Sequence, residues 1–261
     1  MSDRRTLPKE FRDSGEVMSV AVSVADLRDA PEGKRDRQII YGEDFRVVEM
    51  RDGWAYGCAQ KDGYAGYLHA VDLAEKRKPT HFVSARSSHI YPEPDFKSEE
   101  IAPLSFGSGL EIVAEGDRFA ELSSGEFIPR PHIAPIDQLF DDPIEAAERF
   151  MGVPYLWGGN SIWGLDCSGL VQMALLACGV DCPGDADMQQ ASIGVAIGDN
   201  GKPQRGDLFF WKGHVGLIRD ENTLLHANAH YMAVVDEPLD QAIERIMAQG
   251  DGPVTGRRRW K

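Results

Sequence analysis

The chain has 261 residues, 42% of them hydrophobic, and a formal net charge of -14 at pH 7. This length exceeds that of one ordinary small domain and allows two or three cores of modest size. A surface with this excess of negative charge repels nucleic acids and anionic membranes, so neither is expected as a partner. We interpret the basic run at residues 257–259 as an ordinary solvated strand.

No segment approaches the roughly 20 consecutive apolar residues that span a bilayer, and the polar N-terminal residues do not resemble a signal peptide. A cytoplasmic protein is therefore expected. The four cysteines, Cys58, Cys167, Cys178 and Cys182, follow no disulfide or zinc-ligand spacing, which predicts reduced thiols. No cofactor is expected, and the sequence does not indicate an oligomeric state.

Short alternating segments fill the N-terminal half of the chain. A charged and unpatterned stretch predicts a flexible tail at residues 1–15. Alternating apolar and polar residues follow at 16–76, and a weaker copy of this pattern at 77–135. The first copy contains the runs LRDAP (27–31), GEDFRV (42–47) and GYL (66–68). These runs resemble those of bacterial SH3-like domains. Two small SH3-like β-barrels are therefore expected, the second one degenerate.

The pattern changes at a Pro-rich stretch, residues 129–135, which predicts an extended linker. Beyond it, helix-forming residues predict a helix at 143–151, and apolar residues at helical spacing predict a second helix at 167–178. Alternating and β-rich runs in the last third predict an antiparallel sheet packed on this second helix. Residues 136–261 are therefore expected to form one domain of the α+β class.

Cys167 begins the second predicted helix, in the run DCSGL (166–170). The exposed N–H groups and the dipole at a helix N-terminus favour a thiolate, which is the nucleophilic form of cysteine. The backbone N–H of the same residue could also hold the oxyanion of a tetrahedral intermediate. Taken alone, a cysteine here is more often only a small buried side chain.

Two strand-like segments after this helix contain His214 and His226, with a polar turn between them. A turn centred on Asp220 places the two histidines directly opposite each other on one face of the hairpin. One imidazole would then act as a base toward Cys167 while the other fixes its tautomer. The spacing of His226 and His230 also fits two zinc ligands on a helix, but the surrounding residues predict a strand, so no metal is expected.

Several runs in residues 140–261 match a known family in order and spacing. They are YLWGG (155–159), GLDCSGLV (164–171), GDLFF (206–210), GHVGL (213–217) and HA (226–227). The runs resemble those of the NlpC/P60 cysteine peptidases. This resemblance implies a papain-like core, a catalytic triad of Cys167, His214 and His226, and hydrolysis of the γ-D-glutamyl to diamino-acid bond of murein peptides.

The arrangement of two SH3-like domains before such a core resembles that of the γ-D-glutamyl-L-diamino acid endopeptidases of murein recycling. The resemblance implies that the substrate is a small murein peptide with a free N-terminal L-Ala. The diamino acid after its γ-D-glutamyl residue would be diaminopimelate or Lys. An ammonium group needs a carboxylate to offset its desolvation, and Asp185 matches the acidic position of the family. Gly184 replaces the Arg common beside it. Ser168 and Trp157 match pocket positions, and Tyr64 is a candidate contact from the first SH3-like domain.

Two other functions stay open on the sequence alone. The first is an amidase or acyltransferase of the same fold, which would form a thioester with a different acyl donor. The second is a murein-binding protein with a vestigial catalytic core. The presence of Cys167, His214 and His226 counts against the second, and an acidic Asp185 facing the nucleophile favours a peptide amine over a lipid.

Overall fold

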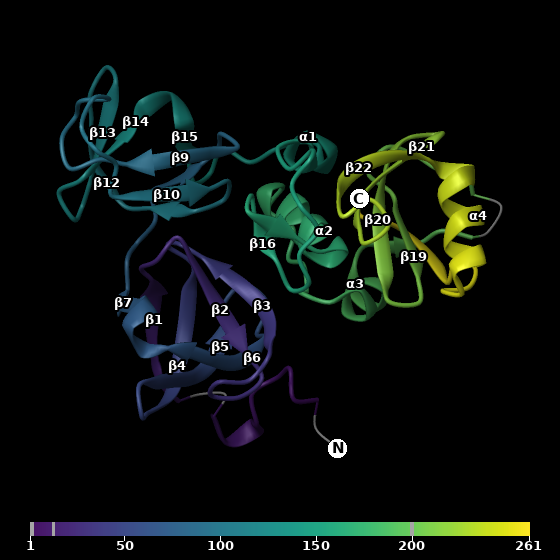
Figure 1. The fold of residues 1–261 in the computed structure, drawn as a ribbon, viewed down its shortest axis with the longest axis horizontal. Helices are drawn as coiled ribbons and strands as arrows, with labels where there is room; N and C mark the ends of the chain where they lie inside the picture. Colours follow the sequence, from purple (N-terminus) through teal and green to yellow (C-terminus); the bar gives the residue numbers. More distant parts are fainter. Residues whose placement is uncertain (1–2, 12–13, 199–200) are drawn as a thin grey trace. The chain divides into compact units, whose positions relative to one another are not determined.

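The computed structural model describes residues 3–11, 14–198 and 201–261. Contacts within the chain group it into two compact units, Met1–Leu139 and Phe140–Lys261. Figure 1 shows strands in the first unit and both helices and strands in the second. The fold class is α+β, as predicted.

One seven-stranded sheet forms the first part of the N-terminal unit. Its strands are β1 (Glu16–Val20), β2 (Val24–Arg28), β3 (Arg35–Ile40), β4 (Asp44–Arg51), β5 (Trp54–Ala59), β6 (Ala65–His69) and β7 (Leu73–Glu75), with the short 3-10 helices η1 (Lys9–Phe11) and η2 (Ala70–Asp72). The spatial order is β3-β2-β6-β5-β4-β1-β7. Alternate side chains such as Leu27, Phe45 and Leu68 form its core, because successive residues of a strand face opposite sides.

Three small sheets complete the N-terminal unit. Their strands are β8 (His81–Val83), β9 (Ser87–Ile90), β10 (Ala102–Ser105), β11 (Gly109–Leu110), β12 (Ile112–Glu115), β13 (Phe119–Leu122), β14 (Phe127–Pro129) and β15 (Ile133–Pro135). Val83, Leu104 and Ile128 belong to a separate core. We propose that the two groups of strands are distinct domains, residues 16–76 and 77–135, and that residues 136–261 are the third.

The Pro-rich stretch 129–135 is not an extended linker, so that prediction is wrong. It contains the end of β14, the 3-10 helix η3 (Arg130–His132) and β15. β15 pairs with β8 and lies at the edge of its three-stranded sheet. An edge strand tolerates proline because the missing N–H can point away from the hydrogen-bonded neighbour.

The C-terminal unit packs helices around a six-stranded sheet. Its elements are α1 (Pro143–Glu148), β16 (Asn160–Ser161), β17 (Gly164–Leu165), α2 (Cys167–Ala177), α3 (Ala186–Ser192), β18 (Val195–Ala196), β19 (Leu208–Trp211), β20 (His214–Asp220), β21 (Thr223–Asn228), β22 (Ala233–Pro238), α4 (Leu239–Gln249) and β23 (Gly256–Arg259). The sheet order is β18-β23-β19-β20-β21-β22. In Figure 1, α2 and α4 lie on opposite sides of this sheet.

The helices of this unit largely follow the predicted pattern. α2 begins at Cys167 as expected, and it ends before Gly179, whose φ of 72° suits a residue without a side chain. α1 is shorter than predicted and ends at Glu148. The basic run 257–259 is a strand as predicted, with Arg259 donating hydrogen bonds to the carboxylate of Asp207.

α4 lies against the sheet through its apolar face. Leu239, Ala242 and Ile246 pack on a cluster that includes Ile218 of β20 and Leu224 of β21. Residues three to four apart share one face of a helix, which explains why these three side chains meet the sheet together. Within the described residues, no helix combines the length and apolarity needed to cross a membrane.

Candidate active site

The N-terminus of α2 is fixed by the side chain of Asp166. Oδ1 of this N-cap residue accepts hydrogen bonds from the N–H of Gly169 at 2.6 Å and from the hydroxyl of Ser168 at 3.1 Å, while Oδ2 accepts from the N–H of Gly158 at 2.9 Å. Capping satisfies a helix N–H group that has no partner within the helix. The same carboxylate therefore anchors both the helix start and the preceding loop around Cys167.

Cys167 is the first residue of α2, and its Sγ atom lies 3.9 Å from the carbonyl oxygen of Gly213. Gly213 directly precedes His214, so the thiol lies beside the start of β20. The N–H groups and dipole at the helix start favour negative charge on this sulfur. The structure thus brings the predicted nucleophile and the segment of the predicted base together.

Tyr155 is a neighbour of this thiol that the sequence reasoning did not single out. Burial raises the pKa of the Tyr155 hydroxyl, and the negative charges that Cys167 and Asp166 can carry raise it further. The phenol therefore stays protonated and can donate a hydrogen bond. The available signal was its place in the run YLWGG, one of the runs that resemble the family.

The two histidines meet, but the predicted register is wrong. β20 and β21 pair with Ile218 opposite Leu224, which makes Gly216, not His214, the residue opposite His226. In agreement, a Cβ built on Gly216 would come within 3.1 Å of the His226 Cβ. The hairpin turn closes one residue later than predicted because the last residue of β20 still pairs across a bulge.

The contact between the histidines is therefore diagonal. Nε2 of His214 lies 2.9 Å from Nδ1 of His226, and the ring centroids are 5.1 Å apart at an interplanar angle of 64°. Diagonal neighbours in an antiparallel pair stay within reach of aromatic side chains. The predicted hydrogen bond between the imidazoles is thus present despite the shifted register.

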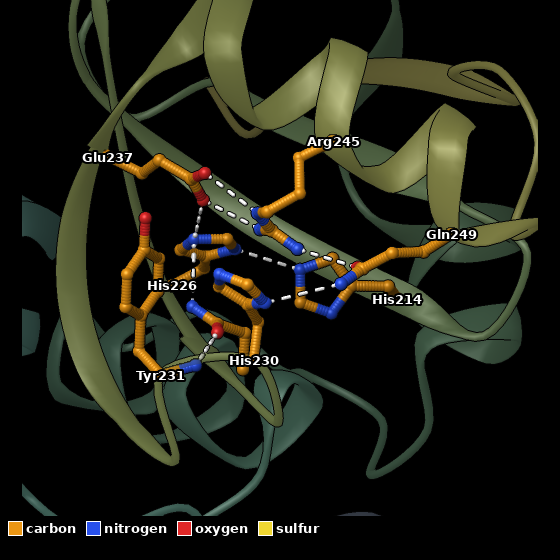
Figure 2. A network of polar contacts seen from close by, with 8 residues as sticks. His214, His226, His230, Tyr231, Glu237, Arg245 and Gln249 are labelled. Carbon is orange, nitrogen blue, oxygen red and sulfur yellow. Dashed lines mark hydrogen bonds and ion pairs between the residues drawn. The ribbon is translucent and has the colours of Figure 1, made fainter.

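A carboxylate and a guanidinium extend the pair of histidines, as Figure 2 shows. Nε2 of His226 lies 3.0 Å from Oε2 of Glu237, and Arg245 of α4 donates to both oxygens of that carboxylate at 2.8 and 2.6 Å. Asn228 places its Nδ2 atom 3.0 Å from the same Nε2. None of these three residues was predicted.

Burial governs the charge of this network. It lowers the pKa of His214 to about 3, and the nearby His226 and Arg245 add to the shift. Burial also lowers the pKa of His226, although Glu237 opposes this effect. For Glu237 burial works in the raising direction, but hydrogen bonds from Arg245 and His226 outweigh it and lower the pKa to about 2. At neutral pH the network therefore holds two neutral rings and one carboxylate.

Two predicted substrate residues belong to α2 and to a segment bonded to it. Ser168 is the second residue of that helix and is buried, with its hydroxyl on Asp166. Asp185 precedes α3, and Gln189 of α3 donates to the carbonyl oxygens of Ser168 at 2.9 Å and Pro183 at 2.8 Å. These bonds join the segment of Asp185 to the helix that carries Cys167.

The other two predicted substrate residues differ in exposure. Trp157 lies in the loop anchored by Asp166 and is 69% exposed, which is unusual for a large aromatic side chain. Tyr64 is 5% exposed and belongs to the core of the N-terminal unit. Their roles toward a substrate stay predictions.

The zinc interpretation of His226 and His230 finds no support in the side-chain geometry. Both ring nitrogens of His226 lie within hydrogen-bond distance of protein groups, and Nδ1 of His230 lies 3.2 Å from Nε2 of Gln249. Over residues 3–11, 14–198 and 201–261, no group of three or more His, Cys, Asp and Glu side chains is arranged to hold a metal ion.

Comparisons with known proteins agree with this geometry. Residues 152–247 match the NlpC/P60 family, and residues 27–73 match the bacterial dipeptidyl-peptidase Sh3 domain. The chain is 32% identical over 217 residues to the gamma-D-glutamyl-L-lysine dipeptidyl-peptidase of Bacillus subtilis (strain 168), covering 73% of this chain and 71% of that protein. It is 28% identical over 219 residues to dipeptidyl-peptidase 6 of Lysinibacillus sphaericus, covering 73% and 79%.

A solved structure shows the same fold. It is that of an NlpC/P60 family protein from Bacillus cereus ATCC 10987, which superposes with a TM-score of 0.77 at 20% identity and covers 94% of this chain and 99% of that one. The extent of the sequence match, together with a thiol at a helix start beside the Gly213 carbonyl and a pair of hydrogen-bonded histidines, places the chain in the NlpC/P60 family of cysteine peptidases.

Proposed function

We propose that the protein hydrolyses the amide bond between γ-D-glutamate and the L-diamino acid of murein stem peptides that carry a free N-terminal L-Ala. The observation that carries the chemistry is the position of Cys167. It starts α2 beside the Gly213 carbonyl, next to a histidine that is hydrogen-bonded to His226. The names of the relatives from Bacillus subtilis and Lysinibacillus sphaericus support the substrate class.

In the proposed mechanism the sulfur of Cys167 attacks the γ-carbonyl carbon while His214 accepts the thiol proton. The backbone N–H of Cys167 and the protonated phenol of Tyr155 are suited to stabilise the oxyanion. His214 then donates the proton to the amine of the departing diamino acid, which leaves a thioester. Water deprotonated by His214 hydrolyses the thioester and releases L-Ala-γ-D-Glu.

The proposed binding site for the N-terminal ammonium group is Asp185. The bonds from Gln189 to Ser168 and Pro183 support this role, because they hold the segment of Asp185 against α2. An ammonium group removed from water requires a fixed counter-charge. Trp157 is proposed to line the pocket.

The requirement for a free N-terminus also suggests where the enzyme acts. Stem peptides carry a free L-Ala amine only after release from the glycan chain. We therefore propose a cytoplasmic role in recycling released murein peptides, with no nucleic-acid or membrane partner.

Peptide hydrolysis with mass-spectrometric product analysis tests this function. The substrates are L-Ala-γ-D-Glu-diaminopimelate, L-Ala-γ-D-Glu-Lys and their N-acetylated forms. We expect release of L-Ala-γ-D-Glu from the free peptides, slow turnover of the acetylated ones, and no product with Cys167→Ala. Absence of the dipeptide product from both free peptides would overturn the proposal.

The same experiment separates the two alternatives. An amidase or acyltransferase of this fold would leave both peptides intact but trap a thioester on Cys167 with another acyl donor. A vestigial core would give neither product nor thioester, while the N-terminal domains in the full chain would still bind intact murein in a sedimentation assay.

A further inference from the structure

We propose that Glu237, held by Arg245, is a positioning residue of the active site. Its carboxylate keeps the hydrogen of His226 on Nε2 and so leaves Nδ1 of His214 available for the proton of Cys167. The proposal rests on the catalytic roles proposed above for Cys167 and His214.

Three adjacent strands each contribute one member of this chain of hydrogen bonds. His214 begins β20, His226 lies in β21 and Glu237 lies in β22. β21 and β22 pair with His226 opposite Val235 and Leu224 opposite Glu237, so Glu237 is the diagonal neighbour of His226. The two contacts, 2.9 and 3.0 Å long, therefore cross the sheet from strand to strand.

The carboxylate gives these contacts a direction. An ionised carboxylate only accepts hydrogen bonds, so Nε2 of His226 must donate to Glu237. Its Nδ1 then carries a lone pair and accepts from Nε2 of His214. A neutral His214 with its hydrogen on Nε2 has an unprotonated Nδ1, which is the form required of a base. Glu237 thus fixes the tautomers of both rings.

The side chain of Asn228 favours the other tautomer of His226. Its Oδ1 accepts from the N–H of Tyr231 at 2.8 Å, which directs its Nδ2 group toward Nε2 of His226 at 3.0 Å. An amide N–H facing that nitrogen would favour a lone pair there and move the His226 hydrogen to Nδ1. The charged acceptor prevails, because a hydrogen bond to an ionised group is about twice as strong as a neutral one.

Burial makes the choice of tautomer firm. His226 is 0% exposed and Glu237 is 3% exposed, so water does not offer either group an alternative partner. Arg245 neutralises the carboxylate from α4 through two hydrogen bonds and itself lies near the ring of Tyr231. Without that guanidinium, the carboxylate would be a costly uncompensated charge.

The decisive experiment combines Glu237→Gln with Asn228→Asp. Glutamine in place of Glu237 removes the charge and lets both neighbouring amides donate to Nε2 of His226. We expect kcat for the free tripeptide to fall at least about tenfold, with KM within about twofold. Aspartate at residue 228 in the same chain returns a carboxylate to the position that faces Nε2, so kcat should recover at least about tenfold.

A purely structural ion pair between β22 and α4 would not respond in this way. Asp236→Asn is the matched control, because Asp236 is the adjacent residue of β22 and its carboxylate pairs with Arg219. Its kcat should match that of the unmodified protein. An unchanged kcat in Glu237→Gln, or a double variant no faster than Glu237→Gln, would overturn the proposal.

Alkylation of Cys167 by iodoacetamide gives a readout independent of the peptide substrate. Its rate should fall with Glu237→Gln and recover with the added Asn228→Asp, even if the proposed substrate is wrong. Thermal unfolding checks each variant. If Glu237→Gln does not fold, Glu237→Gln with Arg245→Gln removes the unpaired guanidinium, and the same loss and recovery are required in that background.

Discussion

Gly216 lies opposite His226 in the β20–β21 hairpin, where a Cβ on residue 216 would approach the His226 Cβ to 3.1 Å and a Leu224 methyl to 2.8 Å. His214 is two residues away on the same face of β20. A side chain at residue 216 would therefore crowd His226, the hydrogen-bond partner of His214.

Gly216→Ala should consequently disturb the histidine pair. We expect kcat to fall at least about tenfold and the free energy of unfolding to fall by about 1 to 3 kcal/mol, because neighbouring side chains must move. Gly198→Ala is the control, since nothing lies within 4 Å of a Cβ built there. Equal activity in the two variants, measured with the free tripeptide, would show that the space is not needed.

Iodoacetamide at about pH 7 should modify Cys167 before the other thiols. Burial raises the pKa of Cys58, and it raises the pKa of Cys178 to about 11, which keeps both as unreactive thiols. Cys182 is buried and contacts the Pro183 carbonyl. Mass spectrometry of tryptic peptides after limited reaction should find the label at residue 167, and Cys167→Ala should remain unlabelled. Preferential labelling of Cys178 would contradict the assignment.

His214 should make the folded protein less stable in acid. The ordinary pKa of 6.5 applies to the unfolded chain, whereas burial lowers the pKa to about 3 in the folded protein. Because the folded pKa is depressed, this stability is fully present above pH 6.5 and is lost as the pH falls toward 3.

The slope from one such proton is at most about 1.4 kcal/mol per pH unit. Urea unfolding from about pH 7 to about pH 4 should therefore show a shallower loss of stability in His214→Gln than in the unmodified protein. Parallel curves would mean that His214 does not titrate in this way.

Substitutions at two N-cap residues, Asp166 and Asp142, should have similar effects on stability but different effects on activity. Asp166→Ala should reduce the free energy of unfolding by about 1 to 2 kcal/mol and reduce kcat at least about tenfold, because the Cys167 loop loses three hydrogen bonds to this carboxylate. Asp142 caps α1 through the N–H of Ile144, and Asp142→Ala should lower stability by a similar amount with kcat unchanged. Unfolding curves and kcat are measured on both proteins, and equal loss of activity would refute the distinction.

Substitution of Asp185 should affect only the turnover of substrates that have a free N-terminal amine. Asp185→Asn is expected to lower kcat/KM for the free tripeptide about 10- to 100-fold, which corresponds to one lost charged hydrogen bond. Turnover of the N-acetylated peptide should stay the same. Asp187→Asn, two residues further on in the first turn of α3, is the control and should resemble the unmodified protein. An equal loss on both peptides would instead indicate a structural role.

Local patterns were sufficient to predict α2 and the strands around it. Apolar spacing, Asp166 before the helix and Gly179 after it each act within a few residues, so the helix start at Cys167 was predictable. α4 was not predicted, although Leu239, Ala242 and Ile246 show helical spacing. The Pro-rich segment was misjudged because edge pairing with β8 depends on distant residues.

The sequence predicted three candidate catalytic residues but not the geometry that joins them. Motif spacing indicated Cys167, His214 and His226. The hairpin register depended on a bulge before Asp220 that no local pattern announces. Glu237 and Arg245 were missed because an acidic residue in a strand and a basic residue on a helix usually face solvent.

The strands that carry His214, His226 and Glu237 are synthesised after the helix that carries Cys167. Cys167 emerges from the ribosome well before β22 and α4, which carry Glu237 and Arg245. Until these later elements dock, the imidazoles lack the partner proposed to orient them, and a slipped strand would turn them to the opposite face. On the positioning role proposed for Glu237, a nascent or locally unfolded chain would lack an oriented base beside Cys167, and proteolytic activity would arise only after β22 and α4 have docked.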